Sequence, residues 1–193
     1  MENPFTLFSQ WFEEAKNHPS ITDATMMSLA TATKEAMPSV RIVLMKGFDD
    51  RGFTFYTNME SRKSLELKQN PYAALCFYWQ PLGRQVRIEG IVEQVSDEEA
   101  DQYFASRPLV SRIGALISEQ SRPLESHGVL MQKVADAQRI YSEMSPPPRP
   151  DRWSGWRVVP SLIEFWKEGD FRLHDRTLYT RLGNHWTQQK LYP

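Results

Sequence analysis

The sequence predicts a mainly β fold, an antiparallel barrel of short strands with helices packed on its outside. Strand-like segments rich in β-branched and aromatic residues fill the first half of the chain and return at its end, with helical spacing between them. This order of strands, helices and strands disfavours alternating βαβ units and a parallel sheet. A length of 193 residues favours a single domain over residues 1–193.

The chain is predicted to begin with a helix inside residues 1–18. Asn3 is a candidate N-cap, and Pro4 takes the first helical position, where its missing N–H costs nothing. One face of this helix is expected to pack on the barrel, because apolar side chains recur at spacings of three and four, at Phe5, Phe8, Trp11, Phe12 and Ala15.

Residues 19–95 are expected to supply the first barrel strands. Asp49-Asp-Arg-Gly52 and Gln80-Pro-Leu-Gly83 are turn sequences between strand candidates, so antiparallel hairpins are the simplest connections. A short helix capped by Ser61 interrupts the strands and stops before Asn70-Pro71. The predicted strands are 25–33, 39–46, 53–57, 72–80 and 85–95.

Residues 96–144 form the predicted helical segment. Ser96-Asp-Glu-Glu99 is a capping box that starts a helix ending near residue 107, and Pro108 permits a new helix to start. Residues 123–144 carry apolar side chains at helical spacing. A run of prolines predicts an extended connector at 145–155, and the final segment, 156–193, is expected to contain strands at 156–159, 162–167, 171–181 and 185–191.

The composition excludes several classes of protein. The 23 basic and 24 acidic residues nearly cancel, so the chain has no overall field that would attract nucleic acid or an anionic membrane. The single cysteine, Cys76, cannot form an internal disulfide, and no signal peptide or spanning segment is visible, so we expect a cytoplasmic protein. The four histidines lack metal-ligand spacing, and no glycine-rich nucleotide loop or serine-hydrolase elbow occurs.

One predicted strand carries an unusual row of potential cations. In an extended strand Arg172, His174 and Arg176 would share one face, because side chains alternate with period two. Such a row requires either full hydration or an electron-rich, anionic ligand. This pattern is compatible with a strand that faces a ligand. It is equally compatible with a solvated edge strand that has Asp175 or Glu164 as neighbours.

Two further sets of residues have the chemistry of phosphate sites. Ser61, Arg62 and Lys63 stand at a predicted helix N-terminus, and Arg41 on a nearby strand could add a bidentate contact. Tyr103 and Arg107 share a helical face, with Ser111 one turn beyond. The alternative for the first set is a capped surface helix, and the alternative for the second is an ordinary amphipathic helix. Two such sets in a neutral chain nevertheless point to two phosphorylated ligands.

The C-terminal sequences Ile163-Glu-Phe-Trp166 and Phe171-Arg-Leu-His-Asp-Arg176 resemble the signature of the pyridoxamine 5'-phosphate oxidase family. The resemblance implies a split β-barrel that binds FMN noncovalently at a homodimer interface. Further blocks that look like those of the family follow in the family's order, at 41–46, 55–58 with 61–63, 84–86, 103–108 and 118–121.

The resemblance also implies roles for individual residues. Arg172 and His174 would be catalytic and would lie over the pyridine ring of the substrate. The substrate phosphate would be held by Lys46, Tyr103, Arg107 and Ser111. The flavin contacts would be Arg41, Tyr56, Thr57, Ser61, Arg62, Lys63, Gln85, Gln120, Ser121, Trp166 and Arg176.

The implied reaction is oxidation of pyridoxamine or pyridoxine 5'-phosphate to pyridoxal 5'-phosphate. A hydride would leave the exocyclic C4' carbon for the flavin, and O2 would reoxidise the flavin with release of H2O2. In such a reaction the protein mainly positions two flat rings and stabilises developing charge.

The chain departs from the family pattern at three points. Lys167 and Glu168 replace a usual glutamine and a usual glycine, and the chain begins close to its first core helix, which bears on lid closure. The two new charges would pair with each other or mark a changed substrate. Two alternative functions therefore remain. One is a related flavin oxidase of another ring system, as in phenazine biosynthesis. The other is a flavin- or pyridoxal-phosphate-binding module without turnover.

Overall fold

The structure, a computed structural model, describes residues 3–141 and 145–193. Within these residues the strands are β1 (Met26–Ala32), β2 (Pro38–Leu44), β3 (Gly47–Asp49), β4 (Gly52–Asn58), β5 (Tyr72–Trp79), β6 (Arg84–Gln94), β7 (Trp153–Lys167), β8 (Asp175–Leu182) and β9 (His185–Leu191). They form one antiparallel sheet in the order β2-β1-β5-β6-β7-β4-β3, from which β8 and β9 branch at β7. The predicted mainly β, antiparallel architecture is confirmed.

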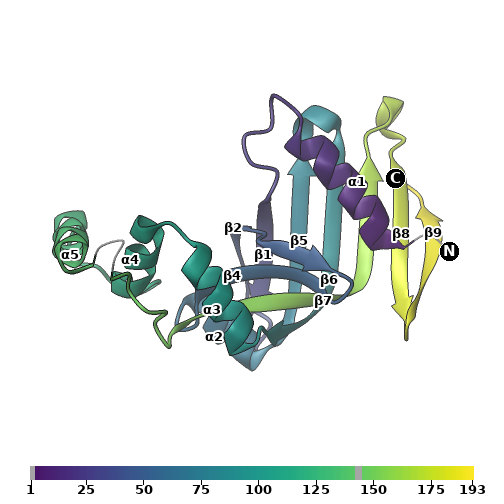
Figure 1. Ribbon diagram of the computed structural model, residues 1–193. Helices are drawn as coiled ribbons and strands as arrows, with labels where there is room; N and C mark the ends of the chain where they lie inside the picture. The colour runs from purple at the N-terminus through teal and green to yellow at the C-terminus, as the bar shows by residue number, and fades with distance from the viewer. Residues whose placement is uncertain (1–2, 142–144) are drawn as a thin grey trace.

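The long strand β7 organises the sheet. Its first half pairs with β4 and its second half with β8, while β6 runs along most of its length. The sheet curls around this strand, as Figure 1 shows. The separate strands predicted at 156–159 and 162–167 are one strand, whose pattern is interrupted where the register shifts at Gly90 of β6. A Cβ at Gly90 would lie 2.0 Å from the carbonyl oxygen of Val159, so the close approach of the two backbones requires glycine.

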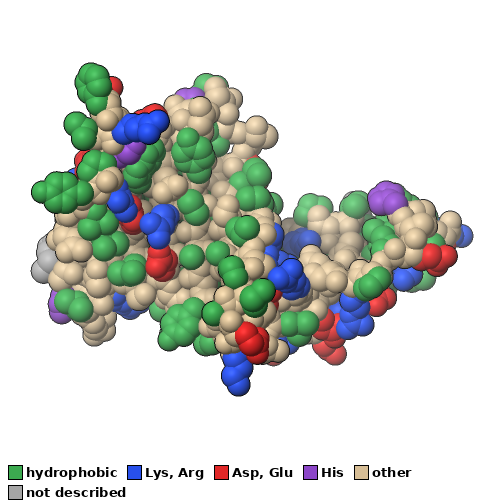
Figure 2. Space-filling view, turned by 180° about the vertical axis from the view of Figure 1, so that it is seen from behind, with side chains coloured by type: hydrophobic (Ala, Val, Ile, Leu, Met, Phe, Trp, Pro, Cys, Tyr) green, Lys and Arg blue, Asp and Glu red, His purple; other side chains and the backbone are tan. Residues whose placement is uncertain are grey.

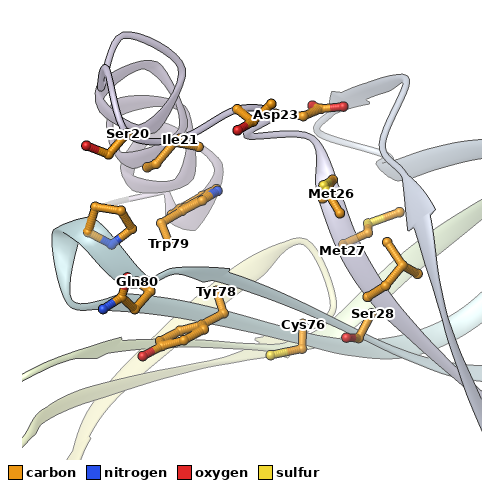
Figure 3. A pocket seen from close by; sticks show the side chains of 13 residues that line it. Ser20, Ile21, Asp23, Met26, Met27, Ser28, Cys76, Tyr78, Trp79 and Gln80 are labelled. Atoms are coloured by element: carbon orange, nitrogen blue, oxygen red, sulfur yellow. The ribbon is translucent and has the colours of Figure 1, made fainter.

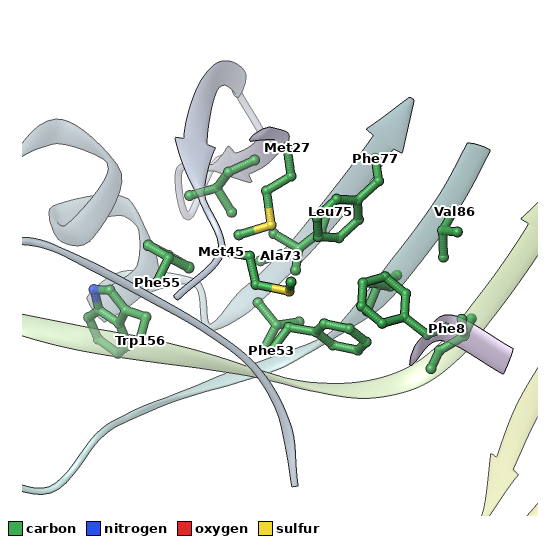
Figure 4. Close-up of a cluster of buried hydrophobic side chains, with 14 of the residues drawn as sticks. Phe8, Met27, Met45, Phe53, Phe55, Ala73, Leu75, Phe77, Val86 and Trp156 are labelled. Atoms are coloured by element: carbon green, nitrogen blue, oxygen red, sulfur yellow. The ribbon is translucent and has the colours of Figure 1, made fainter. Parts of the chain in front are cut away.

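Helix α1 (Pro4–Lys16) covers the core of the sheet (Figure 1). The predicted cap is present, because the Asn3 side chain accepts a hydrogen bond from the Phe5 amide at 3.0 Å. Phe8 is fully buried and packs edge-on against Phe53 and Phe77 of the sheet, in the cluster drawn in Figure 4. Burial of such a side chain contributes roughly 2–3 kcal/mol to folding, so this helix is fastened to the sheet through its apolar face.

The remaining helices are α2 (Arg62–Gln69), α3 (Asp97–Ser106), α4 (Leu109–Ile117) and α5 (His127–Ile140). The predicted capping of α3 is present, with the Glu99 amide donating to Ser96 Oγ at 3.2 Å. Helix α5 starts later than predicted because Ser126 caps it, and the predicted end at 142–144 lies outside the described residues. Helices α4 and α5 extend from the body as an arm (Figures 1 and 2). None of the described helices is long and apolar enough to cross a membrane.

One strand prediction and the predicted end of the connector are wrong. The segment predicted as a strand at 171–181 begins with a turn of 3-10 helix, η2 (Asp170–Arg172), and β8 starts only at Asp175. Phe171 and Arg172 have φ angles of 55° and 64°, which no strand contains, so the row of three cations on one strand face does not form. The connector predicted to reach residue 155 also ends earlier, because β7 begins at Trp153.

Candidate functional site

A pocket of about 430 Å³ opens between β2, β4 and the helical segment. In Figure 2, Lys and Arg side chains gather where the helical arm meets the body. The pocket joins residues that were predicted for two different ligands. It is lined by the predicted flavin contacts Arg41, Tyr56, Thr57, Lys63 and Gln120 and by the predicted substrate residues Lys46, Tyr103 and Arg107.

Lys63 is the buried cation of this pocket. Its Nζ donates hydrogen bonds to Gln120 Oε1 at 2.8 Å, Thr57 Oγ1 at 3.1 Å and Ser61 Oγ at 3.2 Å, all of which are uncharged acceptors. Burial, and next the neighbouring charge of Arg41, lower the pKa of Lys63 from 10.5 to about 8. The ammonium is therefore costly to hold without an anion, and an anionic ligand in the pocket would offset that cost.

Arg41 is held across strands β1 and β2 by a buried carboxylate. Its Nη1 donates to Thr31 Oγ1 at 2.6 Å, and its Nη2 lies 3.4 Å from Glu66 Oε2 and also donates to Ser39 Oγ. Burial lowers the pKa of Arg41, although the charge of Glu66 opposes this effect. Glu66 is not among the residues predicted from the sequence, where the only signal for it is its position four residues after Arg62 on one helix.

An aromatic wall closes one side of the pocket. The ring of Tyr56 stacks on Tyr103 with centroids 4.1 Å apart and on Trp153 at 5.3 Å. The guanidinium carbon of Arg107 lies 4.8 Å from the centroid of the Trp153 ring. Arg107 Nη1 is buried and has no hydrogen-bond partner among the residues that the structure describes, and burial lowers the pKa of the side chain. A buried donor without a partner is costly, so this atom is suited to a ligand acceptor.

Ion pairs fix the helix that carries Tyr103. Glu99 of α3 accepts hydrogen bonds from Arg157 Nη2 at 2.9 and 3.0 Å, and Arg157 is itself buried in β7. Arg149, in the connector, contacts Asp97 and Asp101 on the same helix. These contacts hold α3 against the sheet and thereby set the position of Tyr103 in the pocket wall.

A second group of predicted flavin contacts lies on three adjacent strands. Gln85 of β6, Trp166 of β7 and Arg176 of β8 are opposite one another in register, so their side chains share one face of the sheet. Arg176 Nε donates to the buried carboxylate of Glu164 at 2.7 Å, and this pairing raises the pKa of Arg176. The centroid of the His174 ring lies 4.6 Å from the centroid of the Trp166 ring.

Arg172 lies in the exposed η2 turn rather than on β8. The turn is tight, because a Cβ at Gly169 would lie 2.2 Å from the carbonyl oxygen of Leu173. The Gly169 amide donates to His174 Nδ1 at 3.3 Å. His174 is thus near Trp166, but a backbone turn brings it there instead of strand alternation.

The pocket and the second group lie at opposite ends of β7. Tyr56, in the pocket, is opposite Gly155 near the start of this strand, whereas Trp166 is close to its end. The strand between them rises roughly 35 Å along its length at ~3.3 Å per residue. Figure 1 shows the two ends of β7 beside α3 and beside β8. In the part of the chain that the structure describes, the two groups of predicted flavin contacts are not brought together.

Four predicted residues lie outside both groups. Arg62 and Ser121 line a neighbouring hollow of about 660 Å³, and Ser111 on α4 is not part of the pocket lining. Ser61, predicted as a cap, is at the N-cap position of α2 but makes no capping hydrogen bond with its side chain.

The two charges that depart from the family pattern do not pair with each other. The described ion pairs include neither Lys167 nor Glu168. The Glu168 amide instead donates to the Gly83 carbonyl oxygen at 2.8 Å, and its side chain packs beside Gly83, whose φ of 57° suits glycine.

A further cavity, of about 440 Å³, lies on the outer face of β1 and β5 and is drawn in Figure 3. Its mouth is apolar, with exposed side chains of Met26, Ile42 and Tyr78. Tyr78 is opposite Gln85 in register, so this apolar face adjoins the second group. The half-buried Cys76 lies in the same cavity, and burial raises the pKa of its thiol.

Comparison with known proteins identifies the family. Residues 14–141 match the family model described as pyridoxamine 5'-phosphate oxidase. The chain belongs to the pyridoxamine 5'-phosphate oxidase family. Residues 153–193 match the model described as the pyridoxine 5'-phosphate oxidase C-terminal dimerisation region. The resemblance inferred from the sequence blocks is thereby confirmed.

Full-length relatives of this family are similar to the chain. A pyridoxine/pyridoxamine 5'-phosphate oxidase of Gluconobacter oxydans is 51% identical over 192 residues, covering 99% of this chain and 94% of the relative. The protein of that name in Rhodospirillum rubrum is 52% identical over 197 residues, covering 99% and 96%.

Two solved structures share the fold. PhzG from Burkholderia lata, in complex with tetrahydrophenazine-1-carboxylic acid, has a TM-score of 0.94 at 31% identity and covers 100% of this chain and 94% of its own. An FMN binding protein of Nostoc punctiforme related to pyridoxamine 5'-phosphate oxidase has a TM-score of 0.79 at 17% identity, with coverage of 100% and 98%. The split-barrel prediction is confirmed.

Proposed function

We propose that this chain oxidises pyridoxamine 5'-phosphate and pyridoxine 5'-phosphate to pyridoxal 5'-phosphate, with FMN as cofactor and O2 as electron acceptor. One observation carries the proposal: a single pocket contains the buried ammonium of Lys63 and, separately, the unpartnered guanidinium donor of Arg107. Two cations in one pocket suit two phosphates, one on the cofactor and one on the substrate. The names of the full-length relatives support this assignment.

The residues around Lys63 fit the phosphate of FMN. An ammonium, a guanidinium from Arg41 and the hydroxyls of Thr57 and Ser61 are the donor types that bind a phosphate monoester. Because burial disfavours the charged form of Lys63, an anion bound beside it would stabilise the ammonium. When bound, FMN would supply the two-electron acceptor that no amino-acid side chain provides.

The residues on the opposite wall would hold the substrate. Lys46, Tyr103 and Arg107 would bind its phosphate, and the stacked rings of Tyr56 and Trp153 would keep water from that side of the pocket. Ser111, one helix further on, would join them only if α4 adjusts its position.

The second group is proposed to act on the pocket of another copy of the chain. Gln85, Trp166 and Arg176 would contact the flavin ring, while Arg172 and His174 would orient the substrate's reacting carbon. This assignment is supported by their place at the far end of β7, by the dimerisation region that spans 153–193, and by the exposed apolar face beside them. A C2 dimer would then form two sites, each with residues from both copies.

The test of the reaction is direct. Purified protein is expected to be yellow with flavin absorption, and addition of pyridoxamine 5'-phosphate in air is expected to yield pyridoxal 5'-phosphate and peroxide. Flavin bleaching without product release would support a binding module instead. Failure to react with either phosphorylated vitamer would favour the phenazine-type oxidase, to which the PhzG likeness points.

The shared site has its own test. Co-expression of Lys63→Met with Arg172→Ala puts one change in each half of the site. Random pairing of equal amounts gives half heterodimers, each with one intact site, so about a quarter of the wild-type activity is expected although each variant alone is inactive. Activity no higher than that of the single variants would contradict a site built from two copies.

A further inference from the structure

We propose that Glu66 is a positioning residue for the phosphate end of the cofactor pocket, which it serves by holding Arg41 and Arg62 in place. The assignment rests on the proposed function, because it concerns how that pocket binds the phosphate of FMN. Glu66 lies on α2, and only 6% of its side chain is exposed. A carboxylate is seldom buried unless it is paired, so its partners reveal its role.

The partners of Glu66 connect the pocket with the neighbouring hollow, because Arg41 lines the pocket and Arg62 lines the hollow. Its Oε2 accepts a hydrogen bond from Ser39 Oγ at 2.6 Å and another from Thr31 Oγ1, and it lies 3.4 Å from Arg41 Nη2. Its other oxygen, Oε1, accepts from Arg62 Nε at 2.8 Å. One carboxylate thus fixes a guanidinium from β2 and a guanidinium from α2, and two hydroxyls hold that carboxylate in turn.

The charges around Glu66 match a phosphate monoester. Arg41, Arg62 and the buried Lys63 are cations, and the carboxylate of Glu66 leaves this cluster with a surplus of two positive charges. A phosphate monoester carries about −1.5 to −2 at neutral pH, so its arrival would nearly neutralise the cluster. Without Glu66, three cations would repel one another in the ligand-free protein.

Positioning is expected to outweigh repulsion between Glu66 and the phosphate. The carboxylate already forms ion pairs with Arg62 and Arg41, so little of its field reaches a ligand. Loss of its charge would remove an ion pair from both Arg62 and Arg41, and Arg41 would then be held by its hydrogen bonds to Thr31 and Ser39 alone. A long side chain that is less well held costs up to about 2 kcal/mol to order again when the ligand binds. Glu66→Gln is therefore expected to weaken binding of the phosphate specifically.

The test compares FMN with riboflavin, which has the same ring and no phosphate. Flavin-free wild type, Glu66→Gln and Glu13→Gln are titrated with each compound, and the dissociation constants are read from quenching of flavin fluorescence. Glu13 is an exposed carboxylate on α1 and controls for the same chemical change away from the pocket. Glu66→Gln is expected to reduce the preference for FMN over riboflavin by about tenfold or more, from the strength of hydrogen bonds to charged groups, whereas Glu13→Gln retains it.

Ser39→Ala is the milder variant if Glu66→Gln does not fold, because it keeps the charge and removes one hydroxyl that contacts both Glu66 and Arg41. It is expected to reduce the preference by a smaller factor. If the preference for FMN over riboflavin were unchanged in these variants, Glu66 would contribute to folding only. If the preference became stronger, Glu66 would repel the phosphate. Either result overturns the proposal. A wild type that binds both flavins equally would refute the phosphate pocket itself, and this assignment with it.

Discussion

The buried ammonium of Lys63 predicts an unusual dependence of stability on pH. In the flavin-free protein its pKa is about 8, against 10.5 for an ordinary lysine, because burial and then Arg41 disfavour the charged form. Below pH 8 the folded protein bears the cost of the buried charge, which is about 3 kcal/mol at ~1.4 kcal/mol for each pKa unit. That cost disappears as the pH rises from 8 toward 10.5, because the unfolded chain then binds more protons than the folded one and stability increases with pH.

Urea unfolding of the flavin-free protein at several pH values measures this effect. The free energy of unfolding of wild type, relative to that of Lys63→Met, is expected to rise by about 2–3 kcal/mol between pH 7 and pH 10. Subtraction of the variant removes the contributions of other groups that titrate in this range. Lys68→Met, an exposed lysine on the same helix, is the control and should run parallel to wild type. If the free energies of unfolding of wild type and Lys63→Met changed in parallel with pH, the predicted cost of the buried Lys63 ammonium would be refuted.

Three substitutions test other parts of the structure. Arg107→Ala should raise KM for pyridoxamine 5'-phosphate ten- to hundredfold with a smaller change in kcat, since hydrogen bonds to charged groups contribute about 1.5–3 kcal/mol; steady-state kinetics with an unchanged KM would remove Arg107 from the substrate site. Gly90→Ala should cost at least about 2 kcal/mol in urea unfolding, because its Cβ would meet the Val159 carbonyl oxygen, and wild-type stability would contradict that contact. Phe8→Ala should cost about 3–5 kcal/mol, and a loss below 1 kcal/mol would show that α1 is not fastened through this ring.

Much of the fold follows from local signals. The Asn3 cap with Pro4, the capping by Ser96 and the break at Pro108 act within a few residues, and the helices start where those residues are. The turn at Phe171 and Arg172 could not be predicted, because neither residue type favours a positive φ. That conformation depends on packing of Gly169 against Leu173, which involves contacts between backbone segments.

In the site, too, some residues could be predicted from the sequence and others could not. Lys63 and Arg107 could be found because family blocks contain them, and the structure places both in one pocket. Glu66 and Trp153 could not, because their importance lies in partners distant along the chain. Glu66 meets Thr31 and Ser39 only when α2 packs beside β1 and β2, and Trp153 meets Tyr56 only through the pairing of β4 with β7. Long-range pairing of this kind is not contained in any single segment of sequence.

The length of β7 has a consequence for kinetics. If the two ends of this strand serve two different pockets, a lone chain contains no complete site, and catalysis depends on association of the chains as well as on folding. Well below the dissociation constant of the dimer, the rate should then grow with the square of the protein concentration, and above it in direct proportion. Dilution would therefore reduce specific activity without any chain unfolding.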